Sequence, residues 1–288
     1  MLLLFRLLSA APLWLLHATG VLLGWITYAA SPTYRRRFKA NAAQAGYIFA
    51  QVNAVVGHVG RMVMEVLRLW FGKPLPCDVH GGEAVDQGIA AGKGLVFLTP
   101  HMGCFELAAQ AMARRWGVVH GPITVLYRPA RQVWLAKLME TARERPGLAS
   151  APTTMAGVRQ MLKALRQGHS VGLLPDQVPP DGQGVWSPFF GKPAYSMTLA
   201  AKLAQQTGAA VILARCVRRP GGAGFDMYLR TMTEPLAADM ETAVLQINQE
   251  MERLVRESPE QYLWGYARYK QPRPSPAVAS ATESQKNG

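Results

Sequence analysis

The stretch GLVFLTPHMGCFELAAQAMARRWG, residues 94–117, joins a short apolar run to a run of helix formers through a brief loop. Residues 94–99 predict a buried strand, because the run is short and apolar and follows the turn-prone AGKG. Residues 104–117 are rich in strong helix formers and end at a glycine, as helices often do. The stretch therefore predicts a strand, a loop that contains His101, and a helix.

The same alternation continues on the C-terminal side of this stretch. Apolar runs of strand length are separated by runs with helical periodicity, which predicts an α/β fold with a largely parallel central sheet flanked by helices. Further strands are expected at 123–127, 170–175 and 209–217, an antiparallel strand at 224–230, and helices at 131–144, 155–167, 195–206 and 240–257.

The N-terminus predicts a membrane segment, so the chain divides into an anchor at 1–32, a main domain at 33–270 and a disordered tail at 271–288. From Leu7 to Ala30 there is no formally charged side chain, and the run can cross a hydrocarbon core of roughly 30 Å as a helix. The basic YRRRFK (34–39) follows, which places the main domain on the cytoplasmic face. A monotopic or re-entrant segment and a cleaved signal peptide are the alternatives.

The segment after the anchor, residues 52–70, has valine and leucine at three- and four-residue spacing and predicts an amphipathic helix. Arg61, Glu65 and Arg68 are expected on its polar face. The helix is expected either to pack against the core or to lie on the bilayer.

Composition narrows the classes of partner and site. With 31 Lys and Arg against 18 Asp and Glu, the net charge of +13 favours polyanions such as nucleic acid, anionic lipid head groups or an acidic carrier protein, and charge alone does not choose among them. No nucleic-acid-binding module is recognisable, so no nucleic-acid partner is expected. The three cysteines, Cys77, Cys104 and Cys216, suggest neither disulfides nor a metal site. We expect Cys104 to pack as a small buried residue rather than to act as a nucleophile.

Polar residues follow three of the expected strands: His101, Arg128 and Asp176. In open α/β sheets, ligands bind beyond the carboxyl ends of the strands. We therefore expect these residues to share one site. Arg128 as a solvated surface residue and Asp176 as a turn cap are the alternatives.

His101 and Glu106 form an H-x-x-x-x-E pair. Residues five apart on one helix are rotated by about 140°, so they meet only if His101 lies outside the helix, with Gly103 allowing a tight bend. The carboxylate would then hold one imidazole nitrogen and leave the other facing a cleft as a general base. A histidine that merely caps the helix is the alternative.

The chain resembles the late acyltransferases of lipid A biosynthesis, of the H-x-x-x-x-D/E type. The resemblance rests on the apolar N-terminus, on TPHMGCFE (99–106) and YRPARQVWL (127–135), on the long block 162–212 that contains LLPDQ, and on SPEQYLWGYARYKQPRP (258–274). Where many members have Gly-Asn-Trp inside the histidine motif, this chain has Gly103-Cys104-Phe105. Nearly all of the chain except the tail is covered.

The resemblance implies transfer of a fatty acyl group from acyl carrier protein to a hydroxyl of a 3-hydroxyacyl chain on a lipid A precursor at the inner membrane. His101 would be the base and Glu106 its partner, with no covalent acyl-enzyme, no cofactor and no metal. Arg128, Asp176 and Gly103 would bind substrate or the developing oxyanion. The alternative is an acyl-CoA-dependent acyltransferase acting on a glycerophospholipid or a phosphatidylinositol mannoside.

The loop at 175–193 is unusually apolar, with Trp186, Phe189 and Phe190. It is expected either to line an acyl or lipid groove or to pack against the core.

Overall fold

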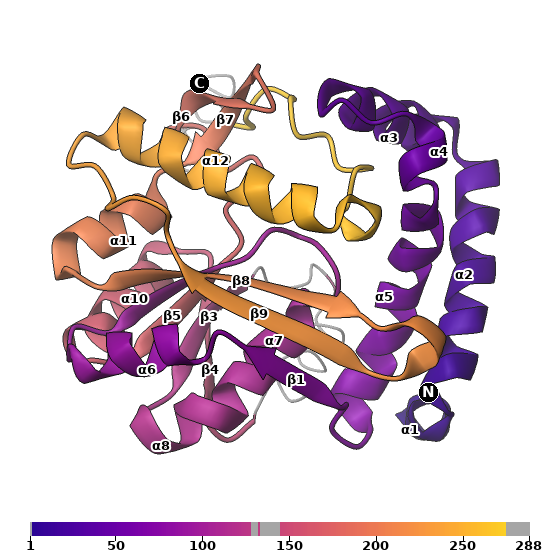
Figure 1. The fold of residues 1–288 in the computed structure, drawn as a ribbon, viewed down its shortest axis with the longest axis horizontal. Coiled ribbons are helices and arrows are strands. Elements are labelled where there is room, and N and C mark those ends of the chain that lie inside the picture. Colours follow the sequence, from indigo (N-terminus) through magenta and orange to yellow (C-terminus); the bar gives the residue numbers. More distant parts are fainter. Residues whose placement is uncertain (1, 128–131, 133–144, 275–288) are drawn as a thin grey trace, which may run out of the picture.

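The computed structural model describes residues 2–127, 132 and 145–274. At its centre lies a seven-stranded sheet of order β1-β9-β8-β2-β5-β3-β4, with helices on both faces (Figure 1). Five neighbouring strands are parallel, while β9 runs antiparallel to β8 and β1 pairs parallel with β9. The strands are β1 (Cys77–His80), β2 (Leu95–Leu98), β3 (Ile123–Tyr127), β4 (Leu148–Pro152), β5 (Ser170–Leu173), β8 (Ala210–Arg218) and β9 (Phe225–Thr231).

The fold class predicted from the sequence, an α/β fold with a largely parallel central sheet, is confirmed. Strand β2 shows why its sequence is apolar throughout: Leu95 and Phe97 join the core on one face, and Val96 and Leu98 join the core on the other. All four of its residues are buried, as expected for a parallel strand covered on both sides.

The helices divide between the two faces of the sheet. One core contains residues of α6 (Glu83–Ala90) and α7 (Phe105–Met112), which continues into a π-helical turn at Ala113–Gly117 and the short α8 (Val118–His120). The other contains residues of α10 (Met155–Arg166), α11 (Leu199–Thr207) and α12 (Met240–Glu257). The His101 loop therefore lies between β2 and a helix packed on the first of these faces.

The structure corrects the expectations for several segments. A two-stranded hairpin, β6 (Gly184–Phe189) and β7 (Lys192–Met197), takes the start of the helix expected at 195–206, because residues 194–196 pair with β6 and are buried. Strands β1 and β4 were not expected, since Cys77–His80 and Leu148–Pro152 are short and only half-buried. The helix expected at 131–144 falls outside the described residues except for residue 132, and the tail does so from residue 275.

The apolar N-terminal run forms two helices instead of one, α1 (Leu2–Ala10) and α2 (Leu13–Ala30), with Pro12 as the N-cap residue of the second. Helix α2 is long and apolar enough to cross a membrane. It packs along α5 (Ala54–Phe71), and the two lie side by side at one end of the sheet (Figure 1).

Glycines bring the backbones of α2 and α5 together. A Cβ at Gly24 would lie 2.1 Å from the Val56 carbonyl oxygen, and one at Gly60 would lie 1.7 Å from the Gly20 carbonyl oxygen. Small residues permit this close helix packing. The remaining N-terminal helices, α3 (Pro32–Gln44) and α4 (Phe49–Val52), lead from α2 to α5.

Glu65 lies on the polar face of α5, as expected, but this face does not meet solvent. Glu65 is fully buried, because the polar face of α5 is turned toward α2 and the end of β8 rather than toward solvent. Its carboxylate is paired there with His17 and Arg218.

Candidate active site

The register of β2 and β5 brings His101 next to Asp176. The two strands pair in parallel with Leu98 opposite Leu173, and each of the two polar residues lies three positions beyond its strand's last residue. The Thr99 amide continues the ladder by donating to the Leu173 carbonyl at 3.3 Å. Side chains 75 positions apart in sequence thereby meet at the carboxyl edge of the sheet.

The Asp176 carboxylate holds His101 at two points. His101 Nδ1 lies 2.7 Å from Asp176 Oδ1, and the backbone amide of His101 donates to Oδ2 at 2.9 Å. An ionised carboxylate only accepts hydrogen bonds, so Nδ1 carries a proton, and in the neutral imidazole the lone pair is then on Nε2. The imidazole thus has one nitrogen anchored and one available to a substrate.

Asp176 is held in its ionised form. Burial by itself would raise the pKa of its carboxyl, but the charge of and hydrogen bonds from His101, together with Arg268, bring the pKa below its usual value. Asp176 is 2% exposed, whereas the His101 side chain is 19% exposed. The carboxylate is thus shielded from solvent behind an imidazole that reaches the surface of a cavity.

The structure corrects the expected partner of the imidazole. Among the contacts of the described residues, the carboxylate bonded to Nδ1 is that of Asp176, whereas Glu106 was expected there. Glu106 lies in the first turn of α7 and lines the same cavity as His101. The two motif residues therefore face one space, and the catalytic role of Glu106 stays a prediction.

Gly103 shapes the loop between His101 and α7. Its φ of +53° lies in the left-handed region, and a Cβ there would lie 1.9 Å from the Cys216 carbonyl oxygen, so only glycine fits. Its amide donates to the Gln261 carbonyl at 2.9 Å, and its carbonyl accepts from Arg218 at 2.7 Å. The bend expected at Gly103 is present, and its amide already has a partner within the protein.

The segment Gln261–Leu263 braces the other side of this loop. The Leu263 amide donates to the His101 carbonyl at 3.0 Å, and Met102 forms a β-bridge with Tyr262. Burial and the nearby Asp176 carboxylate raise the pKa of the Tyr262 hydroxyl well above its usual value. Arg268 is buried at 2% exposure and donates to the Tyr195 carbonyl at 2.7 Å.

Sequence reasoning assigned no role to Tyr262 or Arg268, although both lie in the block YLWGYARYK (262–270). An arginine among aromatic residues was the available signal, because a buried cation needs an acceptor or an anion nearby. In the structure this block supports the Asp176 side of the site.

A cavity of about 200 Å³ opens beside His101. Its polar lining comes from Thr99, His101, Glu106 and Tyr127, and the rest is mostly apolar, from β2, α7, β3, β5 and β8. The apolar lining residues are Phe97, Phe105, Ala108, Ala109, Met112, Val125, Leu126, Leu173, Leu174 and Ala214. The arrangement places a candidate base, His101, at the polar rim of an apolar cavity.

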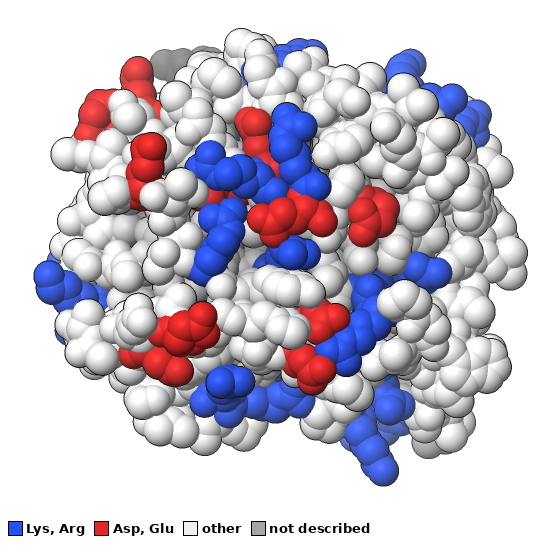
Figure 2. Space-filling model, in the orientation of Figure 1, with Lys and Arg blue, Asp and Glu red and all other residues white. Residues whose placement is uncertain are grey.

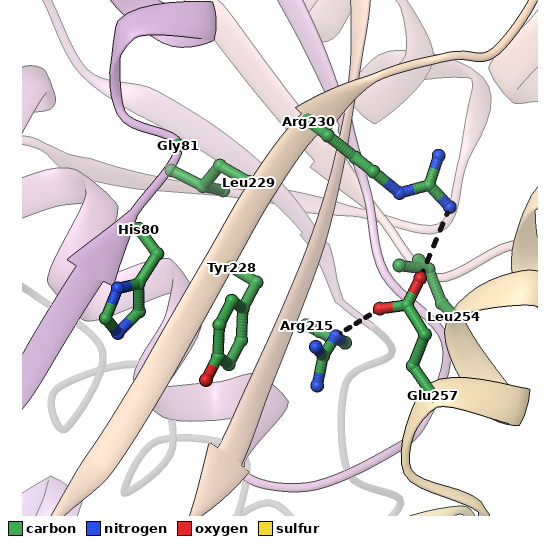
Figure 3. Close-up of a pocket in the computed structure, with 8 residues that line it drawn as sticks. All are labelled: His80, Gly81, Arg215, Tyr228, Leu229, Arg230, Leu254 and Glu257. Atoms are coloured by element: carbon green, nitrogen blue, oxygen red, sulfur yellow. Dashed lines mark ion pairs between the residues drawn. The ribbon is translucent and has the colours of Figure 1, made fainter.

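A second cavity of about 200 Å³ lies against α12, with no lining residue in common with the first. Figure 3 shows Glu257 between Arg215 and Arg230, with ion-pair distances of 2.5 and 3.8 Å. Charges paired in this way are already compensated within the protein. We therefore assign the candidate active site to the cavity beside His101.

The aromatic residues expected to line an acyl groove lie elsewhere. Phe189 and Phe190 are buried in the core that contains Trp264, so the core-packing alternative is correct for them. Trp186, 48% exposed, stacks edge-on with Tyr195 of the same hairpin. The loop closes into a hairpin because its apolar side chains find partners on α12 and the C-terminal segment.

Arg128 lies outside the described residues, so its expected role stays a prediction. Cys104 is buried as expected, and burial raises the pKa of its thiol well above the usual value. Within residues 2–127, 132 and 145–274, no group of three or more His, Cys, Asp or Glu side chains is placed to hold a metal ion.

Residues 49–271 match the model of the bacterial lipid A biosynthesis acyltransferase family. The chain is 28% identical over 218 residues to the lipid A biosynthesis lauroyltransferase of Escherichia coli strain K12. The aligned residues are 74% of this chain and 69% of that protein. It is 25% identical over 207 residues to the palmitoleoyltransferase of the same organism, covering 71% of this chain and 63% of that protein. It is also 29% identical over 179 residues to a phosphatidylinositol mannoside acyltransferase of Mycobacterium tuberculosis, covering 59% and 55%.

Proposed function

Because this chain belongs to the bacterial lipid A biosynthesis acyltransferase family, we propose that it is a membrane-bound acyltransferase of lipid A synthesis. It moves a fatty acyl group of the lauroyl or myristoyl class from acyl carrier protein to a hydroxyl of a 3-hydroxyacyl chain on a lipid A precursor. No cofactor and no metal take part. The observation that carries the proposal is the His101 imidazole, anchored through Nδ1 and set at the rim of an apolar cavity.

The chemistry uses His101 twice. Nε2 takes the proton of the acceptor hydroxyl as its oxygen attacks the thioester carbonyl carbon. When the carbon–sulfur bond breaks, the imidazolium returns that proton to the departing thiolate. The ionised Asp176 stabilises the imidazolium in between and keeps the ring in the required tautomer. No covalent acyl-enzyme is needed.

The cavity supports an acyl substrate. Its apolar lining favours a hydrocarbon chain, since burying each methylene contributes about 0.8 kcal/mol. Glu106 at the same rim is proposed as the catalytic partner of His101. Its carboxylate would stabilise the positive charge of the imidazolium or orient the acceptor hydroxyl. Arg128 is proposed to bind a phosphate or the oxyanion, and Gly103 to shape the site around it.

Surface charge suits anionic partners. The net charge of +13 favours an acidic carrier protein and a phosphorylated lipid. Figure 2 shows acidic and basic side chains interleaved on the α12 face, so this face is not a uniform basic patch. Basic docking surfaces are therefore proposed away from it.

Membrane contact is proposed through α2. Apolar side chains on its outer face are exposed, among them Trp14 (58%), Leu22 (61%) and Ile26 (53%), while the inner face packs on α5. Figure 2 shows the margin of the molecule over α2 largely without charged side chains. Exposed basic residues of α3, Arg36, Arg37 and Lys39, follow directly and suit anionic headgroups on the cytoplasmic face.

This packing favours the interfacial alternative over a span. A spanning α2 would either leave α5 or take the charged residues of α5 into hydrocarbon, where each costs several kcal/mol. An α2 lying in the membrane surface keeps its docking and places the active-site domain beside its lipid.

A second candidate function follows from the similarity to a phosphatidylinositol mannoside acyltransferase. The same base and cavity would serve an acyl-CoA donor and a glycerophospholipid or mannolipid acceptor. The two candidates differ in donor and acceptor rather than in chemistry.

The test is mass spectrometry of lipid products from detergent-solubilised protein. Lauroyl- or myristoyl-carrier protein with a tetra-acylated lipid A precursor should give one added acyl mass, and His101→Ala should lose about a hundredfold to ten-thousandfold of the rate while its melting temperature is kept. Added mass only with acyl-CoA and a glycerolipid or mannolipid would select the second candidate. Normal turnover by His101→Ala would reject His101 as the base.

A further inference from the structure

A buried chain of charged and polar groups runs from α2 to the loop that contains His101. His17 of α2 lies 2.7 Å from Glu65 of α5, and Glu65 receives two hydrogen bonds from Arg218, at 2.6 and 2.7 Å. The three residues are 6%, 0% and 6% exposed. They come from three elements far apart in sequence.

Arg218 connects this series of buried groups to the loop that contains His101. Besides its bonds to Glu65, its Nη2 donates to the Gly103 carbonyl at 2.7 Å. Its backbone amide donates to the side chain of Gln261 at 2.9 Å, and the Gln261 carbonyl accepts the Gly103 amide. Both sides of Gly103, two residues after His101, are therefore fixed through Arg218.

The groups around Glu65 keep the Glu65–Arg218 pair ionised. Burial with the charges of Arg218 and Arg61 lowers the pKa of His58 to about 3, so His58 adds no second cation near neutral pH. Burial opposes the ionised form of Glu65, but Arg218 and His17 lower its pKa to about 2. The Glu65–Arg218 pair is thus ionised and shielded from water.

A buried ion pair is a poor source of stability, because the desolvation of both ions offsets most of their attraction. An apolar pair of similar size would fill the same space at equal or lower cost. Such a pair would leave the Gly103 carbonyl without its donor. The specific consequence of having Arg218 here is therefore the geometry of the loop rather than its stability.

We propose that Arg218 is a positioning residue for His101, and that its support by Glu65 and His17 makes the order of the catalytic loop depend on the docking of α2 against α5. The proposal rests on His101 acting as the base of the proposed function. Docking of the membrane helix and assembly of the active site are then one event.

The test replaces the pair rather than one partner, so that no buried charge is left alone. Glu65→Met/Arg218→Met should keep its melting temperature within a few degrees of the unmutated protein. Its kcat should fall on the order of tenfold to a hundredfold, as expected for misplacing a catalytic group, with KM little changed. The matched control is Arg230→Met/Glu250→Met, which removes an ion pair between β9 and α12 and should leave kcat unchanged.

Hydrogen–deuterium exchange gives a readout that does not need catalysis. Amides of residues 101–106 should exchange faster in Glu65→Met/Arg218→Met than in the unmutated protein or the control pair. His17→Leu should raise the same exchange and lower kcat severalfold, whereas Ala18→Leu on the exposed face of α2 should do neither.

The outcomes separate the two hypotheses. Unchanged loop exchange and unchanged kcat in the double variant would overturn the positioning role, and the same result for His17→Leu would overturn the dependence on α2. An unmutated protein without transferase activity, but with faster loop exchange in the variants, would reject the proposed function and still support Arg218 as the residue that orders the loop.

Discussion

The hydrogen bond between His101 and Asp176 decides which imidazole nitrogen can act as a base. Asp176 accepts from Nδ1, so in the proposed reaction Nε2 is the nitrogen that would take the proton of a substrate hydroxyl. The ring is further placed by an edge-on contact with Phe105, with centroids 5.1 Å apart. At the residue scale, the site consists of the His101 imidazole, held in one orientation by the buried Asp176 carboxylate.

Replacing Asp176 by asparagine tests that orientation. Asp176→Asn keeps the size of the side chain but allows its amide to donate to Nδ1, which favours the unproductive tautomer. We expect kcat to fall about a hundredfold or more at pH 7, with substrate KM little changed. A rate within threefold of the unmutated enzyme would show that the bond does not matter for catalysis.

Glu106 makes a different prediction, because it lines the cavity without being the Nδ1 partner. Glu106→Gln should lose on the order of a hundredfold in kcat if its charge assists the imidazolium. Glu106→Asp should recover part of that loss. Steady-state rates of the two variants with the same acyl donor decide the matter, and equal rates for Gln and Asp would remove the need for a charge at this position.

At the scale of elements, the end of β8 meets α5 and α2 through Glu65. The pKa of Glu65 in the folded protein is about 2, against an ordinary value of 4.5, so its ionisation stabilises the fold above about pH 4.5. This contribution is lost as pH falls from 4.5 through 2. Glu65→Gln, which leaves Arg218 unpaired, should therefore melt well below the unmutated protein at pH 7, and the gap should narrow from pH 5 to pH 3.

The check is the melting temperature by tryptophan fluorescence between pH 7 and pH 3. Glu83→Gln, at an exposed position of α6, is the matched control and should follow the unmutated protein throughout. A gap between Glu65→Gln and the unmutated protein that stays constant with pH would contradict the low pKa.

The elements themselves were foreseeable where local patterning and burial agree. Strands β2, β3, β5, β8 and β9 and helices α10 and α12 lie within a few residues of their predicted ranges. The hairpin β6–β7 was missed, since its strands are stabilised by each other and by packing on α12 rather than by their own alternation. The break at Pro12 was signalled by proline, which lacks the amide that a helix interior needs.

At the scale of the whole molecule, the question is which surface of the enzyme binds the membrane. If α2 lies in the membrane surface, Trp14→Ser/Leu22→Ser/Ile26→Ser should remove most of the flotation with anionic liposomes, since each buried apolar side chain contributes about 1.5–3 kcal/mol and about 1.4 kcal/mol is tenfold in binding. The control Val118→Ser/Val119→Ser/Met155→Ser changes similarly exposed apolar residues of α8 and α10 and should float like the unmutated protein.

Two results would contradict this arrangement. Equal flotation of the α2 variant and the control would exclude α2 as the lipid-facing surface. Resistance of the unmutated protein to alkaline carbonate extraction would favour a spanning helix, which must separate from α5.

The sequence by itself determined the fold class, the family and the positions of His101 and Asp176 just beyond the carboxyl ends of their strands, because these follow from local patterns of burial and from motifs. Only the tertiary structure decided that Asp176 holds the imidazole and that Glu65 is buried between His17 and Arg218. Those contacts depend on strand order, on register and on the closeness of α2 to α5. No local sequence pattern encodes these contacts, because the sequence around a carboxylate does not show which distant side chain the fold will place beside it.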